Sequence, residues 1–164
     1  MQTRRIEAAE WQELRETRLA ALGDSPEAFA ATLADEGAYP DEKWRQQAVW
    51  LSEEADEACF VAEDGSGFGG MAIGFLEEDD PTSAGLVAMW VAPGMRGGGI
   101  GAALLDEVSR WARDAGATRL LLWVNEENLT ARRLYERAGF VPTGEKKPMR
   151  SNPRATELRL ALAL

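Results

Sequence analysis

The feature that most limits the possible folds of this 164-residue chain is a glycine-rich segment, in which four of the five residues from Gly97 to Gly101 are glycine. It follows an apolar run, Leu86 to Val91, that is typical of a strand, and it precedes a helical pattern that extends to Ala115. Glycines at such a junction let backbone N–H groups converge, and a helix N-terminus adds about half a positive charge. The segment predicts an anion-binding turn, with Arg96 placed to contact a phosphate. The alternative is a flexible turn that leads into an ordinary helix.

Two other phosphate-binding motifs fit this segment poorly. A P-loop requires Lys and then Ser or Thr after its last glycine, whereas two alanines follow Gly101. A dinucleotide-binding fingerprint is matched formally by Gly97, Gly99 and Ala102, but residues 93–96 separate these positions from the preceding strand. The P-loop is therefore excluded, and an NAD(P)-binding oxidoreductase module remains a low-ranking alternative.

The N-terminal part of the chain has a mainly helical pattern. A short strand is expected around Thr3 to Glu7, followed by a helix over Trp11 to Leu22 in which apolar residues recur at helical spacing. The segment Asp24 to Glu27 contains the Asp, Ser and Pro of a helix start and predicts a second helix. A third helix is expected around Trp44 to Leu51, after a break at Tyr39 to Asp41. No chemical motif stands out in this part.

From residue 58 onward, strand patterns alternate with helical ones. Strands are expected at residues 58–63, 68–77, 86–91, 120–124, 140–143 and 158–162, turns at 64–67 and 79–83, and helices at 101–115 and 128–139. The run from Leu120 to Val124 is continuously apolar, as in a strand that is covered on both faces. This order predicts the α/β (α+β) class, with a mixed sheet covered by helices. The length predicts a single domain, residues 1–164.

Charge and residue usage exclude several classes of function. The 28 Asp and Glu residues outnumber the 18 Lys and Arg residues, and the resulting net charge of −10 disfavours nucleic acid as a partner. The chain has no histidine and one cysteine, Cys59, so zinc sites and Ser-His-Asp catalysis are not expected. An apolar strand surrounds Cys59, which predicts a buried and inert thiol. The longest apolar stretch, residues 84–92, is far shorter than the ~20 residues that span a bilayer. We therefore expect a cytoplasmic protein.

Two sequence blocks, taken together, resemble a known superfamily. The first, Arg96 to Gly101 preceded by Val91 to Pro93, is similar to the acetyl-CoA motif Arg/Gln-x-x-Gly-x-Gly/Ala of the GNAT superfamily of N-acetyltransferases. The second, Asn128 to Phe140, is similar to the block Asn-x-x-Ala-x-x-Leu-Tyr-Glu-x-x-Gly-Phe of the same superfamily. The resemblance covers Leu86 to Thr143. It implies a mixed, mostly antiparallel sheet of about six to seven strands with helices on both faces and a splayed parallel strand pair that holds CoA.

The resemblance implies how acetyl-CoA would bind. Its pyrophosphate would rest on a turn made of Arg96, Gly97, Gly98, Gly99, Ile100 and Gly101. Its pantetheine arm would enter a V between the parallel strands Leu86 to Val91 and Leu120 to Asn125. Backbone groups near Val91 would pair with this arm, and an N–H group there would face the thioester oxygen. Asn128 would hydrogen-bond the arm, and Tyr135 would lie beside the sulfur.

The resemblance also implies transfer of an acetyl group from acetyl-CoA to a primary amine, by direct attack and without a metal. Tyr135 is the expected general acid, since a phenol with a pKa of about 10 can protonate a thiolate whose thiol has a pKa of about 8.5. The alternative for Tyr135 is a core aromatic. A small molecule, an amino acid or a peptide N-terminus is the expected acceptor, and homodimers are common in the family. A CoA-binding or sensing domain without catalysis is the alternative function.

The sequence indicates no obvious general base. Many family members use a carboxylate on the strand before the glycine turn, but Ala84 to Val91 contains none. The candidates are Glu77, Glu78, Glu126 and Glu127, each of which is otherwise a solvated surface charge. An α-amino acceptor, with a pKa of about 8, would need less help from a base.

Two further groups of residues are candidates for the acceptor side. Trp123 and Asn125 lie two residues apart on the expected central strand and are candidates for the lining of the acceptor pocket. The alternative for Trp123 is a position in the core. Lys146, Lys147 and Arg150 form an expected basic loop in the region that borders the acceptor site in the family. This loop either attracts an acidic group or is simply solvated.

Overall fold

The computed structural model describes residues 1–164 and contains a seven-stranded sheet in the order β1-β2-β3-β4-β5-β7-β6. The strands are β1 (Gln2–Arg5), β2 (Glu57–Glu63), β3 (Phe68–Glu77), β4 (Asp80–Val91), β5 (Arg119–Asn125), β6 (Val141–Pro148) and β7 (Thr156–Ala163). The helices are α1 (Trp11–Asp24), α2 (Leu33–Gly37), α3 (Asp41–Glu53), α4 (Ile100–Asp114) and α5 (Leu129–Arg137), with 3₁₀ turns at Pro26–Ala28 and Pro93–Met95. Only β4 and β5 run parallel; the other pairs are antiparallel. The predicted mixed, mostly antiparallel sheet is therefore confirmed.

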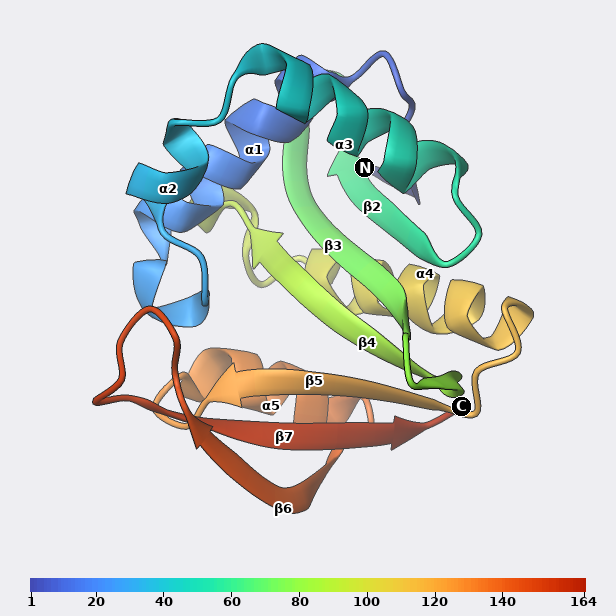
Figure 1. Cartoon of the computed structure of the whole chain (residues 1–164), viewed down its shortest axis with the longest axis vertical. Coiled ribbons are helices and arrows are strands. Elements are labelled where there is room, and N and C mark those ends of the chain that lie inside the picture. Colours follow the sequence, from blue (N-terminus) through green and yellow to red (C-terminus); the bar gives the residue numbers. More distant parts are fainter.

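Helices cover both faces of this sheet (Figure 1). Helices α1 and α3 pack together on one face, where Leu14 and Trp44 belong to a buried apolar cluster. Helix α4 lies on the other face, and its residues Leu104 and Val108 belong to a larger cluster that also includes Tyr135 of α5. None of the helices combines the length and apolar character needed to cross a membrane.

Strand β2 illustrates how one apolar run supplies both cores. Cys59 and Val61 belong to the cluster with α1 and α3, whereas Ala58, Phe60 and Ala62 belong to the cluster with α4. This division follows from the alternation of side chains along a strand. Cys59 is fully buried, as the sequence predicts, and burial raises the pKa of its thiol to about 12. The thiol therefore stays protonated at physiological pH.

The segment Asp24 to Glu27 was predicted to begin a helix, and this prediction is wrong. It leads only into the 3₁₀ turn Pro26–Ala28, because the next residue, Phe29, is extended with φ −123° and ψ 142°. Helix α2 begins at Leu33 instead, where the Thr32 hydroxyl accepts a hydrogen bond from the Asp35 amide at 3.2 Å. The Asp24 carboxylate has other partners, described below, and caps no helix.

Two predictions about the strands also require correction. The predicted turn at residues 79–83 is shorter, and β4 already begins at Asp80, because Asp80 pairs with Glu77 of β3. The predicted basic loop is not a loop at Lys146 and Lys147. These lysines lie in β6, which is longer than the predicted strand at residues 140–143 because it pairs with β7 up to its last residue, Pro148.

Candidate active site

The parallel strands β4 and β5 pair only where they begin. The ladder joins residues 83–85 of β4 to residues 119–121 of β5, and no pair follows. Both strands continue, to Val91 and Asn125, and Figure 1 shows them diverging in this direction. Beyond Gly85, the backbone N–H and C=O groups along these edges have no partner in the opposite strand and are available to a ligand. The structure therefore contains the predicted splayed parallel pair.

A β-bulge bends β4 within the separated segment. Met71 of β3 pairs with Trp90, but Ile73 pairs with Val87, so one residue of β3 faces two residues of β4. One of these two, Ala88, has φ of 55°, in the left-handed region that residues other than glycine rarely adopt. A bulge of this kind redirects the strand and its side chains, and such strain is found preferentially at functional sites.

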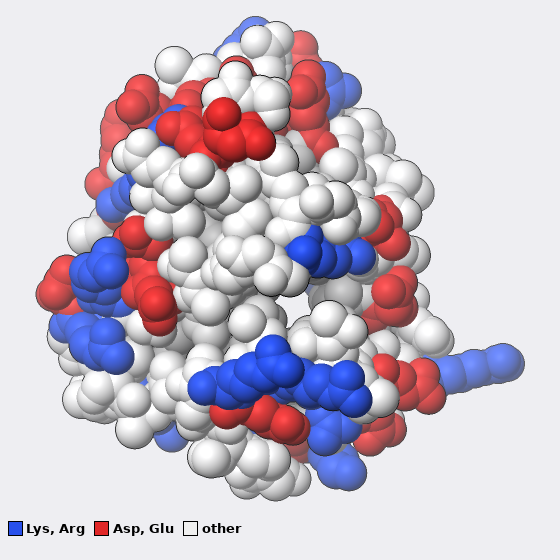
Figure 2. Space-filling model, turned by 180° about the vertical axis from the view of Figure 1, so that it is seen from behind, with Lys and Arg blue, Asp and Glu red and all other residues white.

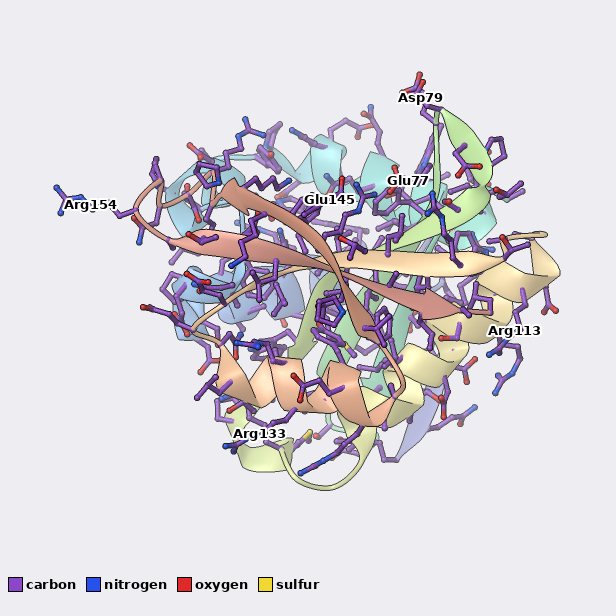
Figure 3. All side chains as sticks on the ribbon, turned by 90° about the horizontal axis from the view of Figure 1, so that it is seen from below. Glu77, Asp79, Arg113, Arg133, Glu145 and Arg154 are labelled. Atoms are coloured by element: carbon purple, nitrogen blue, oxygen red, sulfur yellow. The ribbon has the colours of Figure 1, made fainter.

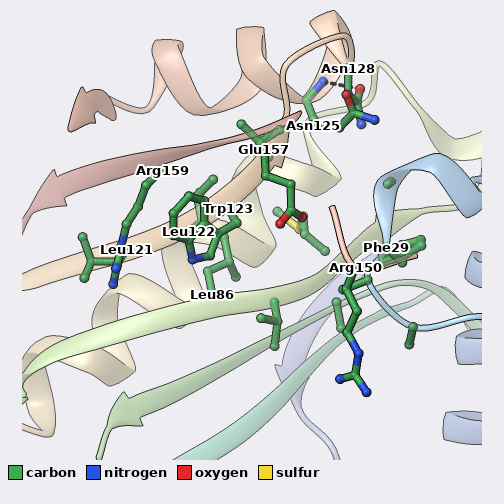
Figure 4. A pocket seen from close by; sticks show the side chains of 18 of the residues that line it. Phe29, Leu86, Leu121, Leu122, Trp123, Asn125, Asn128, Arg150, Glu157 and Arg159 are labelled. Atoms are coloured by element: carbon green, nitrogen blue, oxygen red, sulfur yellow. Dashed lines mark hydrogen bonds between the residues drawn. The ribbon is translucent and has the colours of Figure 1, made fainter. Parts of the chain in front are cut away.

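The diverging strands border a cavity of about 890 Å³. Its walls also include Tyr135 of α5, the segment around Phe29, Arg150, and Glu157 and Arg159 of β7. Figure 4 shows side chains from these elements converging on the space between β4, β5 and β7. On the face opposite to that of Figure 1, the surface is hollowed near its centre, with Lys and Arg side chains above and below the hollow (Figure 2).

Residues 96–101, which we call the glycine turn, connect β4 and its 3₁₀ turn to α4. Gly97 has φ of 83° and Gly99 has φ of 84°, which glycine adopts without strain. No atom lies within 4 Å of where a Cβ would stand on either residue. Helix α4 begins at Ile100 without a side-chain cap and without an acidic residue in its first turn. The free N–H groups of that turn and the positive end of the helix dipole are therefore available to an anion.

The structure divides the predicted site residues into two adjoining groups. Asn128 and Tyr135 line the cavity, whereas Val91 and the glycine turn are not among its lining residues. The two groups approach one another at Gly101, where a Cβ would lie 3.1 Å from Leu134 Cδ2 of α5 and 3.8 Å from Val91 Cγ2. The absence of a side chain at Gly101 thus lets the start of α4 pack against α5, next to the end of β4.

Arg96 is fixed beside the glycine turn by two protein groups. Its Nε donates a hydrogen bond to the Val91 carbonyl at 2.9 Å, and its guanidinium forms an ion pair with Asp24 at the end of α1. Asp24 also accepts hydrogen bonds from the Ser25 hydroxyl at 2.6 Å and from the Trp90 indole N–H at 2.9 Å. These bonds, together with Arg96, hold the pKa of Asp24 at about 2. Because Arg96 is already ordered, it loses little further freedom when it binds an anion.

We expect Asp24→Asn to lower the free energy of unfolding at neutral pH, because an amide cannot form the ion pair with Arg96. The pKa of Asp24 is about 2 in the fold, below the ~3.9 of an unfolded aspartate. The stabilising contribution of the charge is therefore complete above about pH 4 and is lost as the pH falls through about 2. In urea titrations, the difference between wild type and variant should shrink over this range. A difference that is independent of pH would contradict this assignment.

Helix α5 positions two of the predicted site residues, Asn128 at its N-cap and Tyr135 within the helix. The Asn128 Oδ1 caps this helix by accepting a hydrogen bond from the Ala131 amide at 3.1 Å, which leaves its N–H₂ group free of the cap. Tyr135 follows two helical turns later and is 6% exposed, with its ring edge-on to Phe140 at 5.6 Å between centroids. Burial raises the pKa of the Tyr135 hydroxyl above its usual 10, so the phenol keeps its proton at physiological pH.

Trp123 and Asn125 both line the cavity, and two cations flank the Trp123 ring. The Lys147 ammonium lies 4.2 Å from the ring centroid and the Arg159 guanidinium 5.3 Å from it. Arg159 is itself paired with Glu77 of β3 at 3.5 Å and with Glu145 of β6 at 3.6 Å. Figure 3 shows these two glutamates on the same side of the molecule. Sequence reasoning identified Trp123, Lys147 and Glu77 as separate candidates but did not predict that Arg159 and Glu145 join them around one ring.

The four predicted candidate bases are not equivalent in the structure. Glu77 lines the cavity, and its carboxylate is held by Arg159. Glu78 borders a separate, smaller cavity, and neither Glu126 nor Glu127 belongs to the lining of the main one.

Sequence reasoning missed a further carboxylate in the cavity, Glu157 of β7, which is 7% exposed. In the sequence it looks like one of the outward positions that alternate with Leu158 and Leu160. The pairing of Glu157 with Asn125 places both residues on one face of the sheet, toward the cavity. The only sequence signal for Glu157 is that a charged residue occurs in a strand of alternating apolar and polar residues. The face to which that residue points can be assigned only once the register with β5 is known.

Comparison with known proteins identifies a family. Residues 11–140 match the model of the acetyltransferase (GNAT) family. A mycothiol acetyltransferase from Beutenbergia cavernae is 34% identical over 123 residues, which are 74% of this chain and 38% of that protein. An uncharacterized N-acetyltransferase from Methanocaldococcus jannaschii is 32% identical over 111 residues, which are 62% of this chain and 47% of that protein. The chain thus spans less than half the length of these two relatives.

Solved structures share the fold over nearly the whole chain. An acetyltransferase of the GNAT family from Streptococcus pneumoniae superimposes with a TM-score of 0.82 at 17% identity, covering 99% of this chain and 98% of that one. A Salmonella typhimurium protein assigned as an acetyltransferase, solved with its cofactor acetyl-CoA, gives a TM-score of 0.79 at 18% identity and covers 100% and 94%. The family model, the relatives and the shared fold agree, and this chain belongs to the GNAT acetyltransferase family.

Proposed function

We propose that this protein transfers an acetyl group from acetyl-CoA to a primary amine. The observation that carries the proposal is the cavity between the diverging strands β4 and β5, which is lined by a buried tyrosine and accompanied by an uncapped helix N-terminus after the glycine turn. Membership of the GNAT family and the acetyl-CoA bound to a protein of the same fold support acetyl-CoA as the donor. The acceptor is a small molecule, an amino acid or a peptide N-terminus.

The donor would bind across the glycine turn and the cleft. Its pyrophosphate would accept hydrogen bonds from backbone N–H groups of residues 97–101, including Ile100, and a charge-assisted bond from Arg96. The open space above Gly97 and Gly99 suits an anion that approaches the backbone closely. The pantetheine amides would pair with the unpartnered edge of β4 up to Val91, and the free N–H₂ group of Asn128 would bond to the same arm.

In this arrangement Tyr135 would act as the general acid. The amine nitrogen attacks the thioester carbon, and N–H groups of β4 stabilise the oxygen as it gains negative charge. The carbon–nitrogen bond forms and the carbon–sulfur bond breaks, and the departing thiolate takes the hydroxyl proton of Tyr135. Burial raises the pKa of this hydroxyl, so the phenol keeps its proton throughout the physiological range but is a weaker acid than in water. The same desolvation disfavours the charged thiolate and raises its affinity for a proton, so the donor and the acceptor are shifted in the same direction.

The lining of the cavity favours a transferase over a domain that only binds CoA. The space continues beyond Tyr135 to Trp123, Arg150 and Phe29, residues that a bound donor would not need. A dinucleotide site is disfavoured because the 3₁₀ turn Pro93–Met95 separates β4 from the glycines, where a dinucleotide fold has an immediate turn.

Calorimetric titration tests the donor site. We expect acetyl-CoA and CoA to bind and NADH not to bind. Arg96→Ala should raise the Kd for acetyl-CoA by about 10- to 100-fold, because a hydrogen bond to a charged group contributes roughly 1.5–3 kcal/mol. The matched control is Arg113→Ala, which removes an exposed arginine from the last turn of α4, at the far end of the helix that follows the glycine turn (Figure 3), and should leave the Kd within about twofold. Failure of both CoA species to bind the folded protein would refute the proposed function.

A further inference from the structure

Four carboxylates line the cavity, and neighbouring groups hold three of them in place. The four are Asp35, Glu36, Glu77 and Glu157. Glu36 accepts hydrogen bonds from Arg18 at 2.8 and 3.0 Å, Glu77 pairs with Arg159 at 3.5 Å, and Asp35 accepts a hydrogen bond from the Thr32 hydroxyl at 2.8 Å. A carboxylate fixed by such donors already has protein partners for its oxygens and is less free to contact a ligand.

Glu157 differs from the other three. Its side chain is only 9% exposed, and its ion-pair partner, the Lys147 ammonium, lies 3.9 Å away. Figure 4 shows the carboxylate projecting from β7 into the space near Trp123 and Arg150. Burial raises the pKa of Glu157 above its usual 4.5, and Lys147 opposes this shift. The carboxylate is thus desolvated and directed into the cavity, and no close donor holds it, which are the conditions under which a carboxylate accepts a proton from a ligand.

Glu157 and Tyr135 reach the cavity from opposite faces of the sheet. In β5, Val124 packs in the same core cluster as Tyr135, on the face covered by α4 and α5. The next residue, Asn125, points to the other face, where it is the cross-strand partner of Glu157. A thioester carbon between the two faces would therefore have a proton donor on the side of its sulfur and a proton acceptor on the side of the incoming amine.

We propose that Glu157 is the general base that deprotonates the acceptor amine. This assignment rests on the acetyl transfer proposed above. The acceptor's ammonium group gives one proton to the Glu157 carboxylate, and the lone pair of the resulting amine attacks the thioester carbon. After the carbon–nitrogen bond has formed and the thiolate has taken the Tyr135 proton, the nitrogen loses its second proton, which restores Tyr135 through water. Glu157 then releases its own proton to solvent, so that each turnover liberates one proton.

The charges around Glu157 determine the pH range in which it works. Those that share the cavity are Lys147 of β6, Arg150, Arg159 of β7, the ion-paired Glu77 of β3, Asp35 and the ion pair of Arg18 and Glu36. Since the ionised form accepts the proton, kcat/KM for the amine rises as the pH rises through the pKa of Glu157. This rise is the acid limb of the pH profile. Because burial raises the pKa of Glu157, the acid limb lies above the usual glutamate pKa of about 4.3.

The test is the pH profile of kcat/KM for an amine that the wild type acetylates. We expect Glu157→Gln to lower kcat/KM at pH 7 by about 10²-fold, to remove the acid limb, and to leave the Kd for acetyl-CoA within about twofold. Glu157→Asp keeps a carboxylate on a shorter stem and should retain the acid limb at a reduced rate. The matched control is Glu53→Gln at the end of α3, which removes an exposed glutamate outside the cavity and should keep the wild-type profile.

The outcomes separate this assignment from the function on which it rests. Glu157→Gln removes a buried charge, so we expect its free energy of unfolding to equal or exceed that of the wild type. A wild-type pH profile in Glu157→Gln would overturn the assignment and leave acetyl transfer intact. If Glu157→Gln does not fold, loss of the acid limb in Glu157→Asp would overturn it in the same way. A wild type that binds acetyl-CoA and acetylates no amine would overturn both the function and the role of Glu157.

Discussion

Replacing Tyr135 with phenylalanine is expected to lower kcat for acetyl transfer by about 10³-fold, within the range of 10²–10⁴ typical of general acid–base catalysis. The ring would keep its buried position against Phe140, and only the hydroxyl would be lost. Because that hydroxyl is the proposed donor to the thiolate, the loss should appear in kcat while the Kd for acetyl-CoA changes by less than about twofold. Steady-state kinetics combined with calorimetric titration measure both quantities.

The chain provides a matched control for this experiment. Its one other tyrosine, Tyr39, also lines the cavity, where it packs against Trp44 at 5.8 Å between centroids. We expect Tyr39→Phe to retain kcat within about threefold, since its hydroxyl has no part in the proposed transfer. Equal effects of the two substitutions, or a Tyr135→Phe variant with more than one fifth of the wild-type kcat, would remove Tyr135 from its role as the acid.

The second large effect is expected from Gly99→Ala in the glycine turn. Gly99 has φ of 84°, so alanine should destabilise the fold by roughly 1–2 kcal/mol. Its methyl group would also occupy the open space in which the pyrophosphate is proposed to meet the backbone. Loss of a charge-assisted contact of roughly 1.5–3 kcal/mol corresponds to an increase of about 10- to 100-fold in the Kd for acetyl-CoA. Calorimetry and urea titration report the two effects separately.

Gly116 allows backbone strain to be separated from ligand binding. It follows the other end of α4 with φ of 90°, and no atom lies within 4 Å of where its Cβ would stand. Gly116→Ala should therefore lower the free energy of unfolding about as much as Gly99→Ala, without altering the Kd. If both variants bind acetyl-CoA as the wild type does, the glycine turn is not the pyrophosphate site.

The parts of the site that the sequence predicts are those that depend on local spacing. The glycine turn lies between an apolar strand and an amphipathic helix, and Asn128 and Tyr135 keep fixed positions within one short helix. Such features are set by neighbouring residues, so a pattern of residue types is enough to locate them. The order of the elements likewise predicts a mixed sheet, because strands and helices alternate in the second half of the chain.

The remaining parts depend on contacts between distant segments. The divergence of β4 and β5 follows from a ladder that stops at Gly85 and a bulge at Ala88, and neither position carries a turn signal. Asp24 resembles a helix cap in the sequence, but its carboxylate bonds Trp90 and Arg96, which lie 66 and 72 residues away. Glu157 looks like a surface residue until its register with β5 is known. A single sequence contains no direct record of these pairings.

Transfer of an isotope-labelled acetyl group tests the central claim most directly. The protein would be mixed with acetyl-CoA that carries a deuterated acetyl group and with a panel of primary amines that includes amino acids and short peptides with free N-termini. The account predicts, by mass spectrometry, a labelled amide on at least one amine and an equal amount of free CoA thiol, both reduced about 10³-fold in Tyr135→Phe. Saturable binding of acetyl-CoA without label on any amine would contradict it and would indicate a protein that binds CoA without transferring its acetyl group.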